Sequence, residues 1–177
     1  NSLGLTEAQP ENNVQRIVLE MLAVVLSKGA RARAIQLPAW NEAMGLPRPW
    51  DQQWALRMQQ VMAFETDLLE YEDILDGSPV IAAKVAELVE GARQEIANVE
   101  AQGGIIAAIE SGYIKRELVG SHMQRLRAIE SGDLKIIGVN CFQETAISPL
   151  TVGSDGSIMK TDPAAEREQI ERLRAHR

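Results

Sequence analysis

Apolar residues recur with a helical period along most of this chain, and proline or glycine interrupts the pattern every few turns. In the first segment, Ile17, Met21 and Val25 fall on one face before Gly29 ends the pattern. The same reasoning gives the full set of predicted helices, at about 10–28, 51–68, 78–101, 105–111, 113–131 and 162–176. Asp51 is expected to cap the second of these helices. The chain is therefore predicted to be mostly helical.

Two short runs have the length and composition of strands. Residues 32–37 follow the first helix after a glycine-containing connection and end at Pro38, and residues 134–140 are rich in β-branched side chains. A helix followed by a strand is an α/β unit, so the predicted fold class is α/β. Residues 143–162 show little periodicity and are interpreted as a linker before the last helix.

Charge and composition exclude several classes of partner. The formal net charge of -7 and the pI of about 4.9 disfavour binding to nucleic acid. The longest apolar runs are far shorter than the roughly 20 residues that a membrane span requires. One cysteine, Cys141, and two distant histidines provide neither a disulfide nor a metal site, and this is typical of a reducing cytoplasm.

No local signature of catalysis or metal binding is present, and no catalytic residue is assigned. The carboxylates between Glu65 and Asp76 lack the spacing of a calcium loop, so we interpret them as a solvated helix end. His122 is interpreted as an exposed helical side chain and Cys141 as a small apolar one. Glu42 differs from these residues in its position, because it lies just after the run at 32–37, a predicted strand. If that run belongs to a (β/α)₈ barrel, Glu42 lies at the end of a strand where active sites are built.

An ordered series of motifs extends along the whole chain: LTEAQPENN at 5–13, IQLPAWNEAMGLPRPWDQQW at 35–54, LLEYEDILDGSPVI at 68–81, EAQGGIIAAIESG at 100–112 and IIGVN at 136–140. Together they resemble the large chain of the adenosylcobalamin-dependent acyl-CoA mutases. Methylmalonyl-CoA mutases usually read something like HTNALDEAIALP where this chain has QLPAWNEAMGLP. The second motif therefore resembles the ethylmalonyl-CoA mutase branch more closely.

The resemblance implies a fold and a cofactor. Residues 1–142 would form the C-terminal portion of a TIM-type (β/α)₈ substrate barrel with its outer helices. Residues 143–177 would be a linker and terminal helix leading toward a separate cobalamin-binding domain. The family's reaction is a radical rearrangement of the carbon skeleton, for which adenosylcobalamin (coenzyme B12) supplies the chemistry. For the ethylmalonyl branch it would interconvert ethylmalonyl-CoA and methylsuccinyl-CoA.

The resemblance also assigns site residues. Glu42 matches the family glutamate near the adenosyl ribose, and Ala43 and Leu46 lie in the same loop on the corrin side. Ser2 and Leu3 match a Gly-Trp pair beside the corrin, although neither residue type is kept. Arg33 and Ala34 fall where methylmalonyl enzymes carry Gln-Ser near the pantetheine arm of the substrate. No metal ligand is assigned.

Other interpretations remain open. The cobalamin signature DxHxxG and the earlier barrel strands do not occur in these residues, so the segment is expected to be inactive alone. The expected partners are an acyl-CoA substrate, the cobalamin domain and further copies of the full enzyme. The alternatives are a non-catalytic helical interaction module derived from such a barrel, or a methylmalonyl-CoA mutase-type subunit. Trp50 and Trp54 would line an acyl pocket or only pack the helix.

Overall fold

The computed structural model describes residues 2–152 and 158–176, which divide into two compact units. Unit 1 is formed by the described residues of Asn1–Glu72 and Thr145–Arg177, and unit 2 by Asp73–Glu144. None of the described helices combines the length and the hydropathy needed to cross a membrane.

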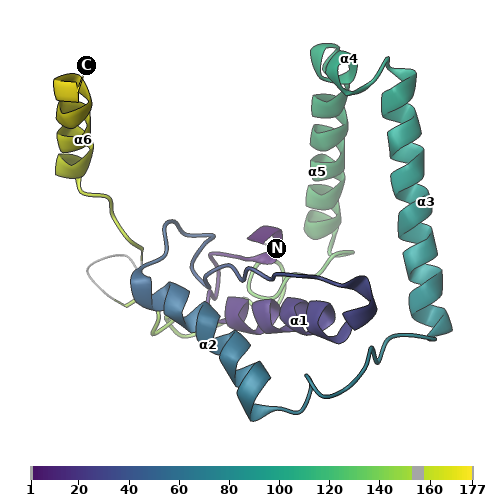
Figure 1. Ribbon diagram of the computed structural model, residues 1–177, viewed down its shortest axis with the longest axis horizontal. Coiled ribbons are helices and arrows are strands. Elements are labelled where there is room, and N and C mark those ends of the chain that lie inside the picture. Colours follow the sequence, from purple (N-terminus) through teal and green to yellow (C-terminus); the bar gives the residue numbers. More distant parts are fainter. Residues whose placement is uncertain (1, 153–157, 177) are drawn as a thin grey trace. The chain divides into compact units, whose positions relative to one another are not determined.

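Unit 1 contains the helices α1 (Asn12–Leu26), α2 (Pro49–Glu65) and α6 (Pro163–His176) and the irregular segments between them (Figure 1). It also contains the short helices η1 (Ser2–Gly4) and η2 (Lys28–Ala30). The predicted helix at 10–28 is confirmed as α1, and its periodic face buries Ile17 and Met21. The other buried apolar residues of unit 1 are Leu5, Ala39, Trp40, Ala55 and Met62.

The start of α2 differs from the sequence prediction. Arg48, rather than Asp51, is the N-cap residue, and Pro49 occupies the first helical position, where its missing N–H costs nothing. Asp51 therefore lies in the first turn of the helix, as its third residue, where its carboxylate accepts a hydrogen bond from the backbone N–H of Arg48 at 2.8 Å. This is one half of a capping box. The prediction of Asp51 as the N-cap is therefore wrong.

Unit 2 contains the helices α3 (Pro79–Ala101), α4 (Ile105–Glu110) and α5 (Tyr113–Ser131). The Ser78 hydroxyl caps α3 by accepting a hydrogen bond from Ile81 N at 3.4 Å. Gly112 has φ +72° between α4 and α5, a left-handed conformation that glycine adopts without strain. Figure 1 shows α3 and α5 joined at one end through α4. Near that end, Tyr113 Oη donates a hydrogen bond to Glu95 at 3.1 Å.

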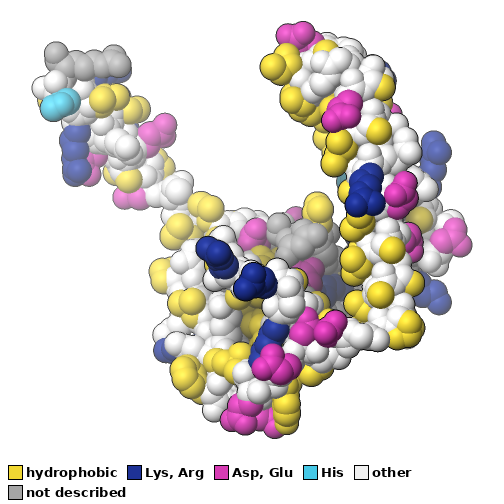
Figure 2. Space-filling model, turned by 45° about the vertical axis from the view of Figure 1, so that its right-hand side comes forward, with side chains coloured by type: hydrophobic (Ala, Val, Ile, Leu, Met, Phe, Trp, Pro, Cys, Tyr) yellow, Lys and Arg dark blue, Asp and Glu magenta, His cyan; other side chains and the backbone are white. Residues whose placement is uncertain are grey.

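The helices of unit 2 expose most of their apolar side chains. Within this unit, which the structure describes throughout, only Ala108 is buried. The large apolar side chains that stay exposed on its helices are Val80, Ile81, Val85, Leu88, Val89, Ile96, Ile105, Ile106, Ile109, Leu118, Val119, Met123 and Leu126. Figure 2 shows such side chains as yellow patches. The helix periodicity was therefore predicted correctly, but few of these helix faces are covered.

The two predicted strands are wrong, because no strand occurs among the described residues. Residues 32–37 are irregular, since no other described segment forms a ladder with them. Residues 134–140 form turns in which the Asn140 side chain binds Ile136 N at 2.7 Å and Leu134 O at 2.7 Å. A single bridge joins Ile137 to Cys141. Local hydrogen bonds thus replace a β-ladder in residues 134–140. The prediction that the chain is mostly helical is confirmed, but the predicted α/β unit of a helix followed by a strand does not form among the described residues.

The segment predicted as a linker, residues 143–162, has no helix or strand in its described part. Residues 153–157 of this prediction lie outside the described residues. The last predicted helix is confirmed as α6, which is exposed along its whole described length.

Candidate functional site

Glu42 lies in a loop that connects the irregular segment 32–37 to α2. The loop is a compact set of turns: Glu42 N donates to Ala39 O at 3.1 Å, and Met44 N donates to Asn41 O at 2.8 Å. Ala39, Trp40 and Asn41 are buried, whereas Glu42 is exposed. The loop therefore has an inner side that packs against unit 1 and an outer side that presents the Glu42 carboxylate.

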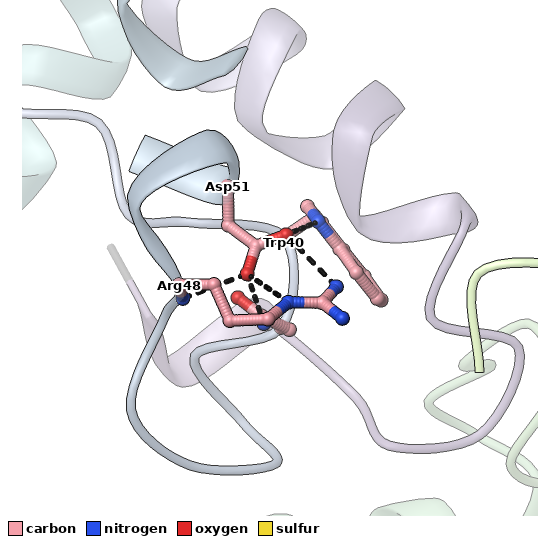
Figure 3. A network of polar contacts seen from close by, with 4 residues as sticks. Trp40, Arg48 and Asp51 are labelled. Carbon is pink, nitrogen blue, oxygen red and sulfur yellow. Dashed lines mark hydrogen bonds and ion pairs between the residues drawn. The ribbon is translucent and has the colours of Figure 1, made fainter. Parts of the chain in front are cut away.

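The Asp51 side chain is the centre of the polar network on the inner side (Figure 3). Its Oδ1 accepts hydrogen bonds from Trp40 Nε1 at 2.8 Å and from Arg48 Nη2 at 3.3 Å. Its Oδ2 accepts from Asn41 Nδ2 at 2.8 Å, Arg48 N at 2.8 Å and Arg48 Nε at 3.0 Å. The carboxylate is fully buried, and Arg48 is its ion-pair partner.

These contacts also set the protonation of Asp51. Burial by itself raises the pKa of this carboxyl group, because the charged form loses hydration. The hydrogen bonds from Arg48, Trp40 and Asn41 favour the charged form and outweigh burial, so the pKa lies below its usual range. Asp51 is therefore a buried carboxylate that stays ionised at neutral pH.

Asn13 of α1 holds the same loop from another direction. Its Nδ2 donates to the backbone oxygen of Trp40 at 2.8 Å and to Thr6 O at 2.8 Å. Its Oδ1 accepts from Thr6 N at 3.0 Å and from Arg16 Nη1 at 2.7 Å. Asn13 is fully buried, and it links the motif at 5–13 with the motif at 35–54.

Two neighbouring pockets contain three of the seven predicted site residues. Arg33 and Ala34 line an open pocket of about 570 Å³ between the end of α1 and α2. Glu42 lines an adjacent pocket of about 400 Å³. Ile35 and Gln59 line both pockets, so the segment 32–37 forms a shared wall. Arg33 and Ala34, predicted for substrate, and Glu42, predicted for the cofactor, thus face adjoining spaces in unit 1.

Of the other predicted cofactor residues, Leu3, Ala43 and Leu46 line neither pocket. Ser2 begins η1, and Leu3 is 83% exposed. Ala43 is half-buried within the Glu42 loop, and Leu46 is 50% exposed at its outer side. The backbone oxygen of Leu46 accepts a hydrogen bond from Met159 N at 2.7 Å. The structure therefore keeps Ala43 and Leu46 in the same loop as Glu42, whereas Leu3 lines neither pocket.

The three tryptophans form a chain beside the loop. The ring centroids of Trp40 and Trp50 are 6.2 Å apart, and those of Trp50 and Trp54 are 5.8 Å apart. The guanidinium of Arg48 lies 4.6 Å from the Trp50 ring centroid, a cation–π contact. Trp54 lines a strongly apolar pocket of about 310 Å³ together with side chains of α1. Here Trp54 packs between helices, while Trp50 stays 44% exposed.

The described residues place no group of three His, Cys, Asp or Glu side chains to hold a metal ion. The acidic residues from Glu65 to Asp76 are mostly exposed, and Asp67 accepts a hydrogen bond from Tyr71 at 2.6 Å. His122 is exposed on α5, and Cys141 is half-buried in a turn.

Sequence reasoning missed the roles of Asn13 and Asp51. For Asp51 a signal was available, because proline at the first helical position places the acid two residues later where it accepts the N-cap N–H. For Asn13 no local signal exists, since its partner Trp40 is 27 residues away in the sequence.

Comparison with known proteins identifies the family. The family model described as "Methylmalonyl-CoA mutase" matches residues 1–177. Over its whole length the chain is 63% identical to an ethylmalonyl-CoA mutase of Cereibacter sphaeroides and 59% identical to one of Methylorubrum extorquens, of which it covers 27% and 26%. A methylmalonyl-CoA mutase of Escherichia coli is 30% identical over 98% of the chain, which covers 24% of that protein.

The chain thus spans about a quarter of the length of these relatives. The resemblance to the acyl-CoA mutases is confirmed, including the greater similarity to the ethylmalonyl branch than to the Escherichia coli methylmalonyl enzyme. Because the family model matches all 177 residues, the chain belongs to the methylmalonyl-CoA mutase family.

Proposed function

We propose that these residues are part of a coenzyme B12-dependent mutase that interconverts ethylmalonyl-CoA and methylsuccinyl-CoA. The observation that carries this proposal is the 63% identity, over the whole chain, to a protein named ethylmalonyl-CoA mutase. Residues 1–142 would contribute the C-terminal portion of a TIM-type barrel, and residues 143–177 would lead toward a cobalamin domain. The full enzyme would be a homo-oligomer that binds acyl-CoA.

Glu42 has the chemistry required of a ribose ligand. Its carboxylate is exposed, lines the 400 Å³ pocket and accepts hydrogen bonds of the kind that ribose hydroxyls donate. Ala43 and Leu46 offer small and apolar groups for the corrin side, and Leu46 has half of its surface free for such a contact. Ser2 and Leu3 would lie beside the corrin, at the position of the family's Gly-Trp pair.

Arg33 and Ala34 would lie beside the pantetheine arm of the substrate. Their support is the 570 Å³ pocket, which also contains Lys28 and so presents two cationic side chains to an anionic acyl-CoA. Adenosylcobalamin, when bound, supplies the radical chemistry of the rearrangement. The residues of this chain would position the ribose and the acyl-CoA in adjoining spaces and exclude water from them.

The test replaces the matching segment of the full-length Cereibacter sphaeroides enzyme by residues 1–177 of this chain. We call the product the segment-exchange enzyme. It is expected to convert ethylmalonyl-CoA at a rate within about tenfold of the parent and to leave methylmalonyl-CoA a poorer substrate. A folded segment-exchange enzyme that binds adenosylcobalamin but prefers methylmalonyl-CoA, or converts neither substrate, would contradict the proposed substrate.

A second candidate is a non-catalytic helical interaction module, favoured by the exposed apolar side chains of α3, α4 and α5. The coding sequence downstream of Arg177 distinguishes the two candidates. A downstream DxHxxG motif supports the mutase, because this motif provides the cobalt ligand in the family. A stop codon shortly after Arg177, in a genome without a separate cobalamin subunit, supports the interaction module.

A further inference from the structure

The donors that surround Asp51 lie on both sides of Glu42 in the sequence. Trp40 and Asn41 precede Glu42 directly, and Arg48 lies after it at the far end of the same loop. Each donates a hydrogen bond to the same buried carboxylate on α2. Asp51 therefore holds the two ends of the segment that carries Glu42 against one point of the helix (Figure 3).

The Glu42 side chain has no such support of its own. Within the described part of the chain its carboxylate makes no hydrogen bond to a protein group, and only its backbone N–H is held, by Ala39 O at 3.1 Å. Its position consequently depends on the backbone of the loop. That backbone is fixed by Asn13 at Trp40 O and by Asp51 at the side chains of Trp40 and Asn41.

The position of the loop depends on the charge of Asp51, because a buried carboxylate requires the hydrogen bonds that the loop donates. A buried charge is tolerated only when it is paired and hydrogen-bonded, and here both oxygens are occupied by donors from the loop. A neutral side chain of the same shape cannot accept all of these bonds, since an amide replaces one acceptor by a donor. Removal of the charge is thus expected to release the loop rather than to leave it in place.

We propose that Asp51 is a positioning residue for Glu42: it fixes the loop so that the exposed carboxylate of Glu42 is held ready for the cofactor ribose. This inference rests on the proposed function of Glu42. It differs from a role in helix capping alone, because a cap acts on the stability of α2 and has no reason to act through Glu42.

The experiment is a double-mutant cycle in the segment-exchange enzyme, with Asp51→Asn, Glu42→Gln and the combined variant. Each single variant is expected to lower kcat by roughly ten- to a hundredfold, the range that loss of a charge-assisted hydrogen bond allows. The combined variant is expected to lose no more than Glu42→Gln alone, because Asp51 acts through Glu42. KM for the acyl-CoA should stay within about twofold, since the arm lies in the other pocket.

The matched control is Glu65→Gln, an exposed carboxylate at the other end of the same helix, which should leave kcat unchanged. Losses that multiply in the combined variant, or an unchanged kcat in Asp51→Asn while Glu42→Gln is impaired, overturn the positioning role and leave the proposed function of Glu42 intact. An unchanged kcat in Glu42→Gln overturns both.

A milder variant keeps the test decisive if Asp51→Asn fails to fold. Arg48→Lys preserves the positive charge and the backbone N–H but loses the guanidinium bonds to Asp51, and the Arg48 side chain is 17% exposed. Its smaller expected loss of kcat, about threefold or more, must also vanish in the Glu42→Gln background. Persistence of that loss in the Glu42→Gln background overturns the proposal.

Discussion

Asn13 and Asp51 are fully buried polar side chains that hold one loop from two different helices. Asn13 binds mainly backbone groups of Thr6 and Trp40, whereas Asp51 binds mainly side chains and carries a charge. The two therefore respond differently to solution conditions. Asn13 is insensitive to pH, while the contribution of Asp51 follows its ionisation.

The free energy of unfolding is expected to depend on pH through Asp51. The folded-state pKa of this group is lowered, so it stabilises the fold above the unfolded pKa of about 3.9, and this contribution is lost as pH falls through the folded-state value. The stability difference between the parent chain and Asp51→Asn should shrink between about pH 6 and about pH 3. Urea unfolding followed by circular dichroism measures it. A difference that stays constant across this range would contradict the assignment.

Gly45 allows the loop to turn beside the segment that follows residue 157. Its φ is +152°, and a Cβ at this position would lie 3.1 Å from Ile158 Cδ1. Gly45→Ala is expected to lower the free energy of unfolding by about 1–3 kcal/mol, through backbone strain and this contact. Urea unfolding is again the measurement. Adding Ile158→Ala removes the close contact but not the backbone strain. The double variant should therefore recover only part of the lost free energy of unfolding. Full recovery would show that backbone strain is absent.

The site was only partly predictable from the sequence. Glu42 was correctly placed in a loop before a helix, because Pro38 and Pro47 mark the loop and the apolar period marks the helix. The buried network was not predicted. Burial of Asp51 requires Trp40 and Asn41 to fold back onto α2, and single residues give no signal for such a contact between distant segments.

At the scale of secondary structure, helices were predictable and strands were not. The third predicted helix begins after Ser78 as expected, because a serine cap followed by proline is a local signal. A strand depends on a partner elsewhere in the chain. The β-branched run at 134–140 therefore folded into turns, in which Asn140 supplies the bonds that a ladder would have supplied.

Gly120 within α5 and Gly112 at its N-cap provide a matched test of this helix. Gly120 lies inside α5, and a Cβ there would meet nothing within 4 Å, whereas Gly112 has φ +72° at the start of the helix. Gly120→Ala is expected to stabilise α5 by about 0.5–1 kcal/mol, and Gly112→Ala to destabilise it. Thermal unfolding by circular dichroism compares the two. A lower melting temperature for Gly120→Ala would contradict the open surroundings of this position.

At the scale of the whole molecule, the chain exposes more surface than its mass requires. Its accessible area is 13485 Å². Two separate compact bodies of the sizes of units 1 and 2 would expose about 10,000 Å² in total. The exposed apolar residues of α3, α4 and α5 contribute to the difference.

The 177-residue chain is consequently expected to self-associate in solution, because large exposed apolar surfaces favour association. Light scattering after size exclusion should give a mass above the 19.5 kDa of one chain, increasing with concentration. The segment-exchange enzyme, in which the rest of the full-length protein is present, is the control and should show a single mass. A monodisperse monomer of the isolated chain that binds no hydrophobic dye would contradict this expectation.

The row of tryptophans beside the Glu42 loop has an optical consequence. Trp40, Trp50 and Trp54 are the only tryptophans of the chain, and their neighbouring ring centroids are 6.2 and 5.8 Å apart. All indole absorption of the chain therefore occurs at this cluster, and the excitation energy can transfer between neighbouring rings before a photon is emitted. Unit 2 contains no tryptophan, so it contributes no tryptophan emission. Tryptophan fluorescence thus reports events at the loop and the neighbouring part of α2, and a chromophoric cofactor that approaches Glu42 would quench all three indoles together.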